Sequence, residues 1–285
     1  KFFLSSYKDI ALAVYPMTMM FFHHIVRHAK RYDCILFPSR DGYFLCRLYN
    51  RLRESRKDLG LPEGKYIYAS RMALSRAAAC DEESFRALLD KLFSDHLLNC
   101  KDYILNQFDY ELPEEYDSPS GKLLEMWGKE GLIRKLKAYY PEIEAKLERH
   151  KSAYLEYLDA LDLKRYRWAA MVDVVSYGTQ AYCLSRMLNR EIDLLALGTT
   201  DVPNVYVDNP ERVFSVYGNI NKKAGGAVYS CSNLSVAHLL LELLYASTDG
   251  QFMGISEDQK PLFQSGTGYN PGLVRGVQGE LVRIM

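Results

Sequence analysis

Residues 169–184, AAMVDVVSYGTQAYCL, start as a short apolar run and continue as the beginning of a helix. Asp173 stands at the end of the apolar run, and the small or hydroxyl-bearing residues of 176–179 follow it. Many α/β folds hold a phosphate with a buried strand that ends in such a turn and leads into a helix N-terminus. This stretch therefore predicts a strand, a phosphate-binding loop and a helix.

The same succession of strand, loop and helix is expected earlier in the chain. Residues 33–37, DCILF, predict a buried strand, which the turn PSRDG and an amphipathic helix ending at Gly60 follow. A second strand is expected over 65–69, and it closes on Ser70 and Arg71. Strands that alternate with helices indicate a mainly parallel sheet with both faces covered, so the expected fold class is α/β.

The pattern continues after residue 184. The segments DLLALGTT and RVFSVYGNI predict two more strands, and LSVAHLLLELLYAS predicts a buried helix. From Gly250 onward, the glycine-rich sequence predicts loops and short strands. Between the two α/β segments, residues 81–165 have charged sequences of helical periodicity. We expect a core of residues 1–80 and 166–285, with 81–165 as a helical insertion and candidate acceptor-binding cap.

The composition gives no reason to expect a nucleic-acid or membrane partner. The 285 residues contain 36 lysines and arginines against 36 aspartates and glutamates, so any anion site must be local. The six cysteines are scattered without metal-ligand spacing, which favours reduced thiols and a cytoplasmic location. The apolar segment 10–32 contains a proline and three histidines, so we expect a core helix and no transmembrane segment.

Three polar loops follow predicted strands: SRDG at 39–42, the pair at 70–71, and DVVSYGT at 173–179. Because the carboxyl ends of parallel strands meet at one edge of a sheet, we expect these loops to converge. The chain has no Walker loop, no GxGxxG after a strand, no HExxH, no GxSxG and no DxDx[TV], which argues against several enzyme classes. Two candidate site loops remain: residues 173–179, which suit phosphate binding, and a second loop that contributes Ser39, Arg40, Asp41 and Gly42.

Residues 169–184 resemble a ligand loop of the phosphoribosyltransferases. In that family, an apolar strand, an acidic pair and a run of small residues hold the ribose hydroxyls and the 5-phosphate of phosphoribosyl pyrophosphate. Asp173 stands at the first acidic position, whereas Val174 occupies the second and the loop is slightly short. The resemblance assigns the phosphate cradle to Ser176, Tyr177, Gly178 and Thr179.

The stretches FPSRDGYFL (37–45), YASR (68–71) and VDVVSYGTQ (172–180) resemble, in this order, three short motifs of a narrower group. These are the bacterial glycan phosphoribosyltransferases of capsule and O-antigen assembly. The resemblance implies a phosphoribosyltransferase-like fold and inverting transfer of a 5-phosphoribosyl group from phosphoribosyl pyrophosphate, with Mg²⁺, to a glycan hydroxyl. It also implies a separate haloacid-dehalogenase phosphatase that removes the phosphate from the ribofuranoside product.

The chemistry of such a transfer suggests roles for individual residues. Arg40 and Arg71 would pair with pyrophosphate, because a guanidinium binds phosphate oxygens in two places. Asp41 would act as general base toward the acceptor hydroxyl, and Asp173 would accept hydrogen bonds from the ribose. Further substrate contacts are expected from Ser39, Gly42, Ser70, Gln180 and Glu242.

Each signal also has an ordinary structural interpretation. Asp173 could cap the following helix, SRDG could be a surface turn with Arg40 in solvent, and Glu242 could be a paired structural carboxylate. Arg71 and Arg76 would usually belong to a solvated helix face. Two other functions stay open: a nucleotide-sugar glycosyltransferase that uses the same loops, and a noncatalytic module of a polysaccharide assembly complex.

Overall fold

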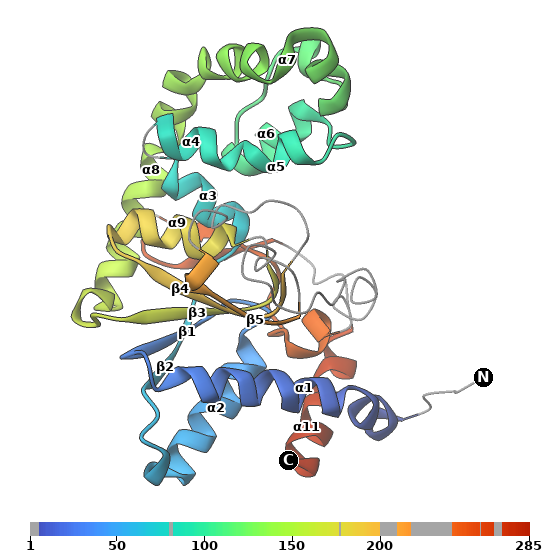
Figure 1. The fold of residues 1–285 in the computed structure, drawn as a ribbon, viewed down its shortest axis with the longest axis vertical. Helices are drawn as coiled ribbons and strands as arrows, with labels where there is room; N and C mark the ends of the chain where they lie inside the picture. The colour runs from blue at the N-terminus through green and yellow to red at the C-terminus, as the bar shows by residue number, and fades with distance from the viewer. Residues whose placement is uncertain are drawn as a thin grey trace.

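The computed structural model describes residues 6–79, 82–176, 178–199, 210–217, 241–256, 258–264 and 270–285. Within these residues, five parallel strands form a central sheet in the order β2-β1-β3-β4-β5 (Figure 1). Helices cover both faces, so the predicted mainly parallel α/β fold is confirmed. The strands are β1 (Cys34–Pro38), β2 (Glu63–Ile67), β3 (Ala169–Ser176), β4 (Ile192–Thr199) and β5 (Val213–Tyr217).

The strand order reverses between β1 and β3. From β1 the chain proceeds to β2 on one side, whereas β3, β4 and β5 follow one another on the other side. Leu36 of β1 lies between Lys65 of β2 and Met171 of β3. In doubly wound sheets, ligands bind at the carboxyl ends of the strands beside such a reversal. The loops after β1 and β3, which carry Arg40 and Gly178, begin at this point.

Side chains of the sheet alternate between two hydrophobic cores. Leu36 and Met171 face one core, and Ile35 and Val172 face the other. Because both faces are covered, β1, β3 and β4 are mostly apolar and buried, as parallel strands usually are, whereas the edge strand β2 is only partly buried. In Figure 1, α1 (Tyr7–Ala29), α2 (Tyr43–Ser55) and α11 (Pro271–Ile284) lie on one side, and α3 (Arg71–Ala78), α8 (Tyr140–Ala160) and α9 (Thr179–Leu188) lie on the other.

The segment 82–160 is helical and extends away from the sheet on the α3 side (Figure 1). Its buried side chains, such as Phe85 and Phe108, belong to the same core as α3 and α9. Non-helical dihedral angles at Gly128 (φ 66°, ψ 166°) break α7. Before α8, the segment contains α4 (Glu82–Leu88), α5 (Asp90–Ser94), α6 (Cys100–Phe108), the 3-10 turn η2 (Glu114–Tyr116) and α7 (Ser120–Lys137). The other 3-10 turns are η1 (Lys57–Leu59), η3 (Leu163–Arg165) and η4 (Pro210–Arg212).

The prediction of loops and short strands from Gly250 onward is wrong for the last segment. The short strands are present as an antiparallel pair, β6 (Phe252–Ile255) and β7 (Pro261–Phe263), but residues 271–284 form α11. Asn270 caps this helix by accepting from the backbone N–H of Leu273 at 3.4 Å. A Cβ added at Gly276 would lie 2.4 Å from the Tyr7 ring, so this glycine lets α11 pack closely on α1. Close packing therefore outweighs the low helix propensity of glycine.

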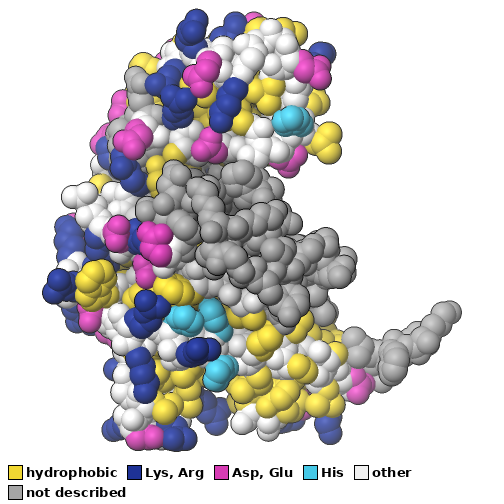
Figure 2. Space-filling model, in the orientation of Figure 1, with side chains coloured by type: hydrophobic (Ala, Val, Ile, Leu, Met, Phe, Trp, Pro, Cys, Tyr) yellow, Lys and Arg dark blue, Asp and Glu magenta, His cyan; other side chains and the backbone are white. Residues whose placement is uncertain are grey.

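Helix α1 is long and apolar enough to cross a membrane by length and composition alone. Its most apolar window has a mean hydropathy of 1.3, and 33% of that window is buried. One face packs against α11 and β4, and Thr18 on this face accepts a 2.9 Å hydrogen bond from the Tyr245 hydroxyl. Hydrophobic side chains also gather on the outer surface over α1 (Figure 2). The role of α1 as a core helix and the expected lack of an anchor stay predictions.

Candidate functional site

A cavity of about 630 Å³ opens at the carboxyl ends of β1, β2 and β3. This volume lies within the range of small-molecule sites, roughly 300–1,000 Å³. The three polar loops expected to converge all contribute to its wall, as does the helical segment 241–245. Of the predicted site residues, the following line it: Ser39, Arg40, Asp41, Ser70, Arg71, Asp173, Ser176, Thr179, Gln180 and Glu242.

Two predicted glycines shape the loops without lining the cavity. A Cβ at Gly42 would lie 2.5 Å from the carbonyl oxygen of Pro38, so only glycine fits this tight turn. Gly178 has a left-handed φ of 79°, and its N–H donates to Ser176 Oγ at 2.8 Å. Tyr177, the remaining predicted residue, lies outside the described residues.

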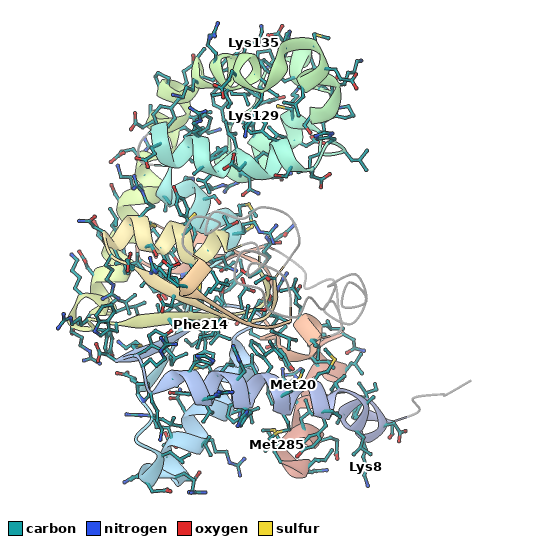
Figure 3. The ribbon with its side chains drawn as sticks, in the orientation of Figure 1. Lys8, Met20, Lys129, Lys135, Phe214 and Met285 are labelled. Atoms are coloured by element: carbon teal, nitrogen blue, oxygen red, sulfur yellow. The ribbon has the colours of Figure 1, made fainter. Side chains whose placement is uncertain are left out.

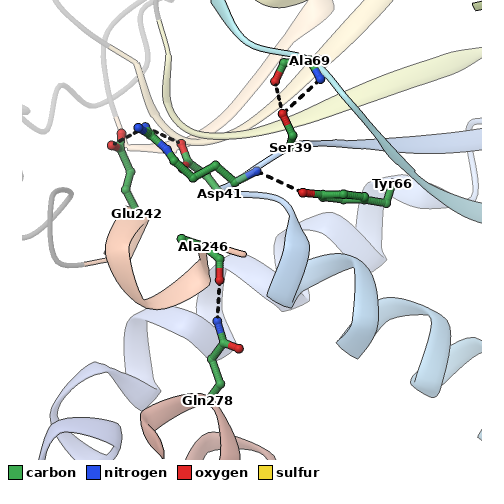
Figure 4. Close-up of polar contacts among 8 residues, drawn as sticks. Ser39, Asp41, Tyr66, Ala69, Glu242, Ala246 and Gln278 are labelled. Carbon is green, nitrogen blue, oxygen red and sulfur yellow. Dashed lines mark hydrogen bonds and ion pairs between the residues drawn. The ribbon is translucent and has the colours of Figure 1, made fainter. Parts of the chain in front are cut away.

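The serines of the first two loops are engaged by backbone groups. Ser39 Oγ donates to the carbonyl of Ala69 at 2.6 Å and accepts from its N–H at 3.1 Å, which joins the ends of β1 and β2 (Figure 4). Ser70 caps α3 by accepting from the N–H of Ala73 and donates to the carbonyl of Phe252. These hydroxyls hold the loops in place, which limits what they can offer a ligand.

Arg40 lies at the centre of the site in a constrained conformation. Its φ of 70° is in the left-handed region, which costs about 1–2 kcal/mol for a residue with a side chain. Its N–H donates to the Tyr66 hydroxyl at 3.2 Å, and its carbonyl accepts from the N–H of Ser247 at 3.1 Å. The guanidinium contacts Asp41 at 2.7 Å and Glu242 at 3.4 Å (Figure 4). Arg40 therefore contacts two acids, and its side chain stays 40% exposed.

Of the carboxyl groups that line the cavity, those of Asp41, Asp173 and Glu242 have raised pKa values. Burial raises the pKa of Asp173 to about 7, and the charges of Asp41 and Glu242 contribute to the increase. Burial, together with the charge of Asp41, raises the pKa of Glu242 to about 7. Burial also raises the pKa of Asp41, although Arg40 and Arg71 oppose this. Because their pKa values lie near neutrality, Asp173 and Glu242 can exchange protons at physiological pH.

The position of Val174 explains why the second acid of the expected loop is missing. The Val174 side chain is fully buried in the core on the other face of the sheet, together with Val172. A carboxylate at position 174 would therefore lie among apolar side chains, away from the cavity. Glu242 reaches the cavity from a distant part of the chain instead, where its charge acts on Asp173.

Sequence reasoning missed a whole wall of the cavity. Arg76, treated above as a solvated residue, has a side chain only 11% exposed. Its Nε is buried without a hydrogen-bond partner among the described residues. The only hint in the sequence was its position in the helix after Ser70. The other missed lining residues are Met72, Leu105, Asn106, Gln107, Asp109, Gln251, Phe252, Met253 and Gln264.

The residues of the cavity fit a magnesium ion that arrives with its ligand. Among the described residues, no group of three histidine, cysteine or carboxylate side chains is arranged to hold a metal. Mg²⁺ commonly binds through substrate phosphates, waters and one or two carboxylates. Asp173 or Glu242 would supply such a carboxylate.

Comparisons with known proteins name no family for this chain: no protein-family model and no curated protein matches it. A proposal for its function therefore depends on the residues of the cavity and on the motif resemblance.

Proposed function

We propose that the protein transfers a 5-phosphoribosyl group from phosphoribosyl pyrophosphate to a hydroxyl of a glycan acceptor, with inversion at the anomeric carbon. The observation that carries this proposal is the meeting of Arg40, Arg71, Asp41 and Asp173 in one cavity where the strand order reverses. The phosphoribosyltransferase-like form of the α/β fold is part of the same proposal. The order of the sheet and the ligand loop after β3 support it.

The pyrophosphate would lie against Arg40 and Arg71. Both line the cavity, and Arg71 is the first residue of α3, where backbone N–H groups favour an anion. The charge of Arg71 lowers the pKa of Asp41, Asp173 and Glu242, so it acts across the whole cavity. Fixed cations at this end assist the reaction because negative charge grows on the departing pyrophosphate.

The ribose would lie against the loop after β3. Asp173 was expected at the end of its strand, but β3 continues to Ser176; Asp173 is buried within β3 and lines the cavity, where it can accept from a ribose hydroxyl. Thr179 and Gln180, at the start of α9, would receive the 5-phosphate at a helix N-terminus. The Gln180 Oε1 atom is buried without a hydrogen-bond partner among the described residues, so it can accept from a ligand hydroxyl.

Asp41 would be the general base. In the transfer, the acceptor hydroxyl oxygen forms a bond to the anomeric carbon, and the bond from that carbon to the pyrophosphate oxygen breaks. The electron pair leaves with pyrophosphate, and the hydroxyl proton passes to the carboxylate. The raised pKa of Asp41 makes it a stronger base than a solvated aspartate. Magnesium bound to the donor would neutralise charge on the leaving group.

The acceptor would enter beside the helical segment. Leu105, Asn106 and Gln107 of α6 line the cavity, which supports an acceptor-binding role for residues 81–165. The product would be a β-ribofuranoside 5-phosphate, the substrate of the expected partner phosphatase. The cytoplasmic location, inferred from cysteine usage, and the lack of a nucleic-acid partner stay predictions.

Mass spectrometry tests this proposal directly. A synthetic glycan acceptor is incubated with phosphoribosyl pyrophosphate, Mg²⁺ and the protein, and the proposal predicts the addition of one phosphopentose. A parallel reaction contains a nucleotide sugar in place of the donor. Transfer only from the nucleotide sugar would replace this function with a different glycosyltransferase. Lack of transfer from either donor, with glycan binding intact, would favour a noncatalytic module.

A further inference from the structure

A second cavity, of about 530 Å³, adjoins the first at Asp109, which lines both. The second cavity lies along α8 and beside the β6–β7 hairpin. A ligand longer than the phosphoribosyl donor and one sugar could therefore continue from the first cavity into the second. The other lining residues of the second cavity are Ala145, Lys146, Arg149, His150, Ala153, Ile255, Ser256 and Leu262.

Asp109 lies between the two cavities and contacts one cation from each of them. It follows α6 in a left-handed conformation (φ 56°), where its N–H donates to the carbonyl of Leu105 at 2.9 Å. One carboxylate oxygen lies 3.7 Å from Arg76 of the first cavity, and the other lies 3.6 Å from Lys146 of the second. Both distances are too long for hydrogen bonds to Asp109, and Arg76 Nε has no hydrogen-bond partner among the residues that the structure describes.

Positive charge exceeds negative charge around this junction. Lys146 and Arg149 line the second cavity, where Asp109 is the one acidic lining residue, and Arg76 lies beside Asp109 in the first. Burial and the charge of Arg76 lower the pKa of His150, so this residue is neutral at pH 7. Arg149 is exposed and forms no ion pair within the part of the chain that the structure describes.

The wall of the first cavity next to this junction suits a sugar. Asn106 and Gln107 precede Asp109 in the same cavity lining, and Gln251 and Gln264 add two further amides. Each amide side chain offers both donors and an acceptor, as a ring of sugar hydroxyls requires. In this arrangement, the amides of the first cavity would contact a sugar, and the excess of cations would lie next to that sugar along the groove.

We propose that the two cavities form one acceptor groove, and that Arg76, Lys146 and Arg149 recognise an anionic sugar, carrying a carboxylate or a phosphate, next to the sugar that receives the phosphoribosyl group. This inference rests on the proposed function for the placement of the acceptor hydroxyl. It adds the chemical class of the acceptor: an acidic glycan of at least two sugar units.

Calorimetry with three probes of equal length tests the groove. The probes are a galacturonate trimer, a galactose trimer that carries one phosphate monoester, and a neutral galactose trimer. The groove predicts tighter binding of at least one acidic probe than of the neutral one, and the two acidic probes distinguish carboxylate from phosphate. In a Lys146→Gln, Arg149→Gln double variant, acidic-probe affinity should fall about tenfold, because each exposed charge contributes modestly. Affinity for the neutral probe should change little.

A matched variant controls for the loss of two positive charges. Lys129 and Lys135 of α7 lie at the far end of the helical segment (Figure 3), and neither lines the two cavities. Lys129→Gln, Lys135→Gln should therefore bind the acidic probe as the wild type does. Equal affinity for all three probes, or an equal loss in both double variants, would overturn the inference.

A measurement of donor binding distinguishes failure of the groove inference from failure of the proposed function. Phosphoribosyl pyrophosphate is titrated into the same proteins. Donor binding and transfer without a preference for acidic acceptors would refute the groove and leave the function standing. Preference for the acidic probe without donor binding would refute the function and leave the groove standing.

Discussion

Replacing Asp41 with asparagine removes the proposed base while it preserves the shape of the side chain. A general base contributes about 10²- to 10⁴-fold to a rate, so kcat should fall within that range. Donor affinity should change only a few-fold, because the substitution releases Arg40 from its 2.7 Å contact and leaves its charge available to pyrophosphate. Steady-state rates of phosphopentose transfer and calorimetric donor binding measure the two quantities separately.

The pH dependence of the wild-type rate provides a second measure. The base must be ionised, and burial raises the pKa of Asp41 above its ordinary value. The rate should therefore fall as pH decreases through that raised pKa. In Glu242→Gln, a neighbouring negative charge is lost from the free enzyme, so the falling limb of kcat/KM should move to lower pH.

The two variants together decide which carboxylate is the base. If Glu242→Gln loses the rate and Asp41→Asn keeps it, Glu242 is the base. If Asp41→Asn loses donor affinity as much as rate, Asp41 binds the donor or its metal ion. If both variants keep wild-type kcat, neither carboxylate accepts the proton and the mechanism is wrong.

Four further substitutions, the last of them a control, test other parts of the structure. Arg40→Ala should weaken donor binding about 10- to 100-fold, the value of a charge-assisted contact, and an unchanged dissociation constant would refute its pyrophosphate role. Asp173→Asn should raise the melting temperature at pH 8 and have little effect near pH 4. Because the folded-state pKa of Asp173 is raised to about 7, ionisation of this carboxyl destabilises the folded protein as pH rises from about 4 to 7, by at most about 4 kcal/mol. Thermal unfolding at both pH values would detect no difference between the two proteins if the pKa were not raised. Gly276→Ala should destabilise the protein by about 1–3 kcal/mol, because the added Cβ would meet the Tyr7 ring. Gly279 has open space around it, so Gly279→Ala should stabilise the protein by about 0.5–1 kcal/mol. Equal denaturation midpoints for the two variants would contradict the packing of α11 on α1.

Local sequence was sufficient to predict the sheet because each strand is marked within a few residues. The apolar runs before Ser39 and Ser176 end in polar loops, and this pattern depends on no distant contact. Helix α11 was missed because its stabilisation is tertiary. The glycines that lower its helix propensity are compatible with its packing, and at Gly276 the packing on Tyr7 depends on the missing Cβ.

The difference between features set by local sequence and features set by tertiary packing also applies to the candidate site. Its residues from β1, β2 and β3 could be predicted, because parallel strands bring their carboxyl ends together. The α6 wall could not be predicted, since its place depends on how the helical segment packs on α3 and α9. Arg76 has an ordinary helical context in the sequence, and only the fold buries it beside Asp109.

The charge balance of the cavity predicts that donor binding is coupled to proton uptake. Arg40 and Arg71 lower the pKa of Glu242, which is nevertheless raised to about 7 by burial and by Asp41. A bound diphosphate would bring further negative charge and compete for both guanidiniums, so the pKa of Glu242 should rise again. Because a group with a pKa near 7 is about half protonated at pH 7, this increase requires the uptake of a proton from solution.

Calorimetry in two buffers of different ionisation enthalpy measures that uptake. The titrant is the preformed magnesium complex of phosphoribosyl pyrophosphate, so that protons released by metal binding to the donor do not contribute. We expect net uptake at pH 7 in the wild type and a smaller uptake in Glu242→Gln. Equal uptake in both proteins would assign the proton to another group, and zero uptake in the wild type would mean that the diphosphate does not bind near Glu242. Proton uptake on binding would also hold Glu242 in the protonated form during transfer, which leaves Asp41, paired with Arg40, as the carboxylate able to accept the acceptor's proton.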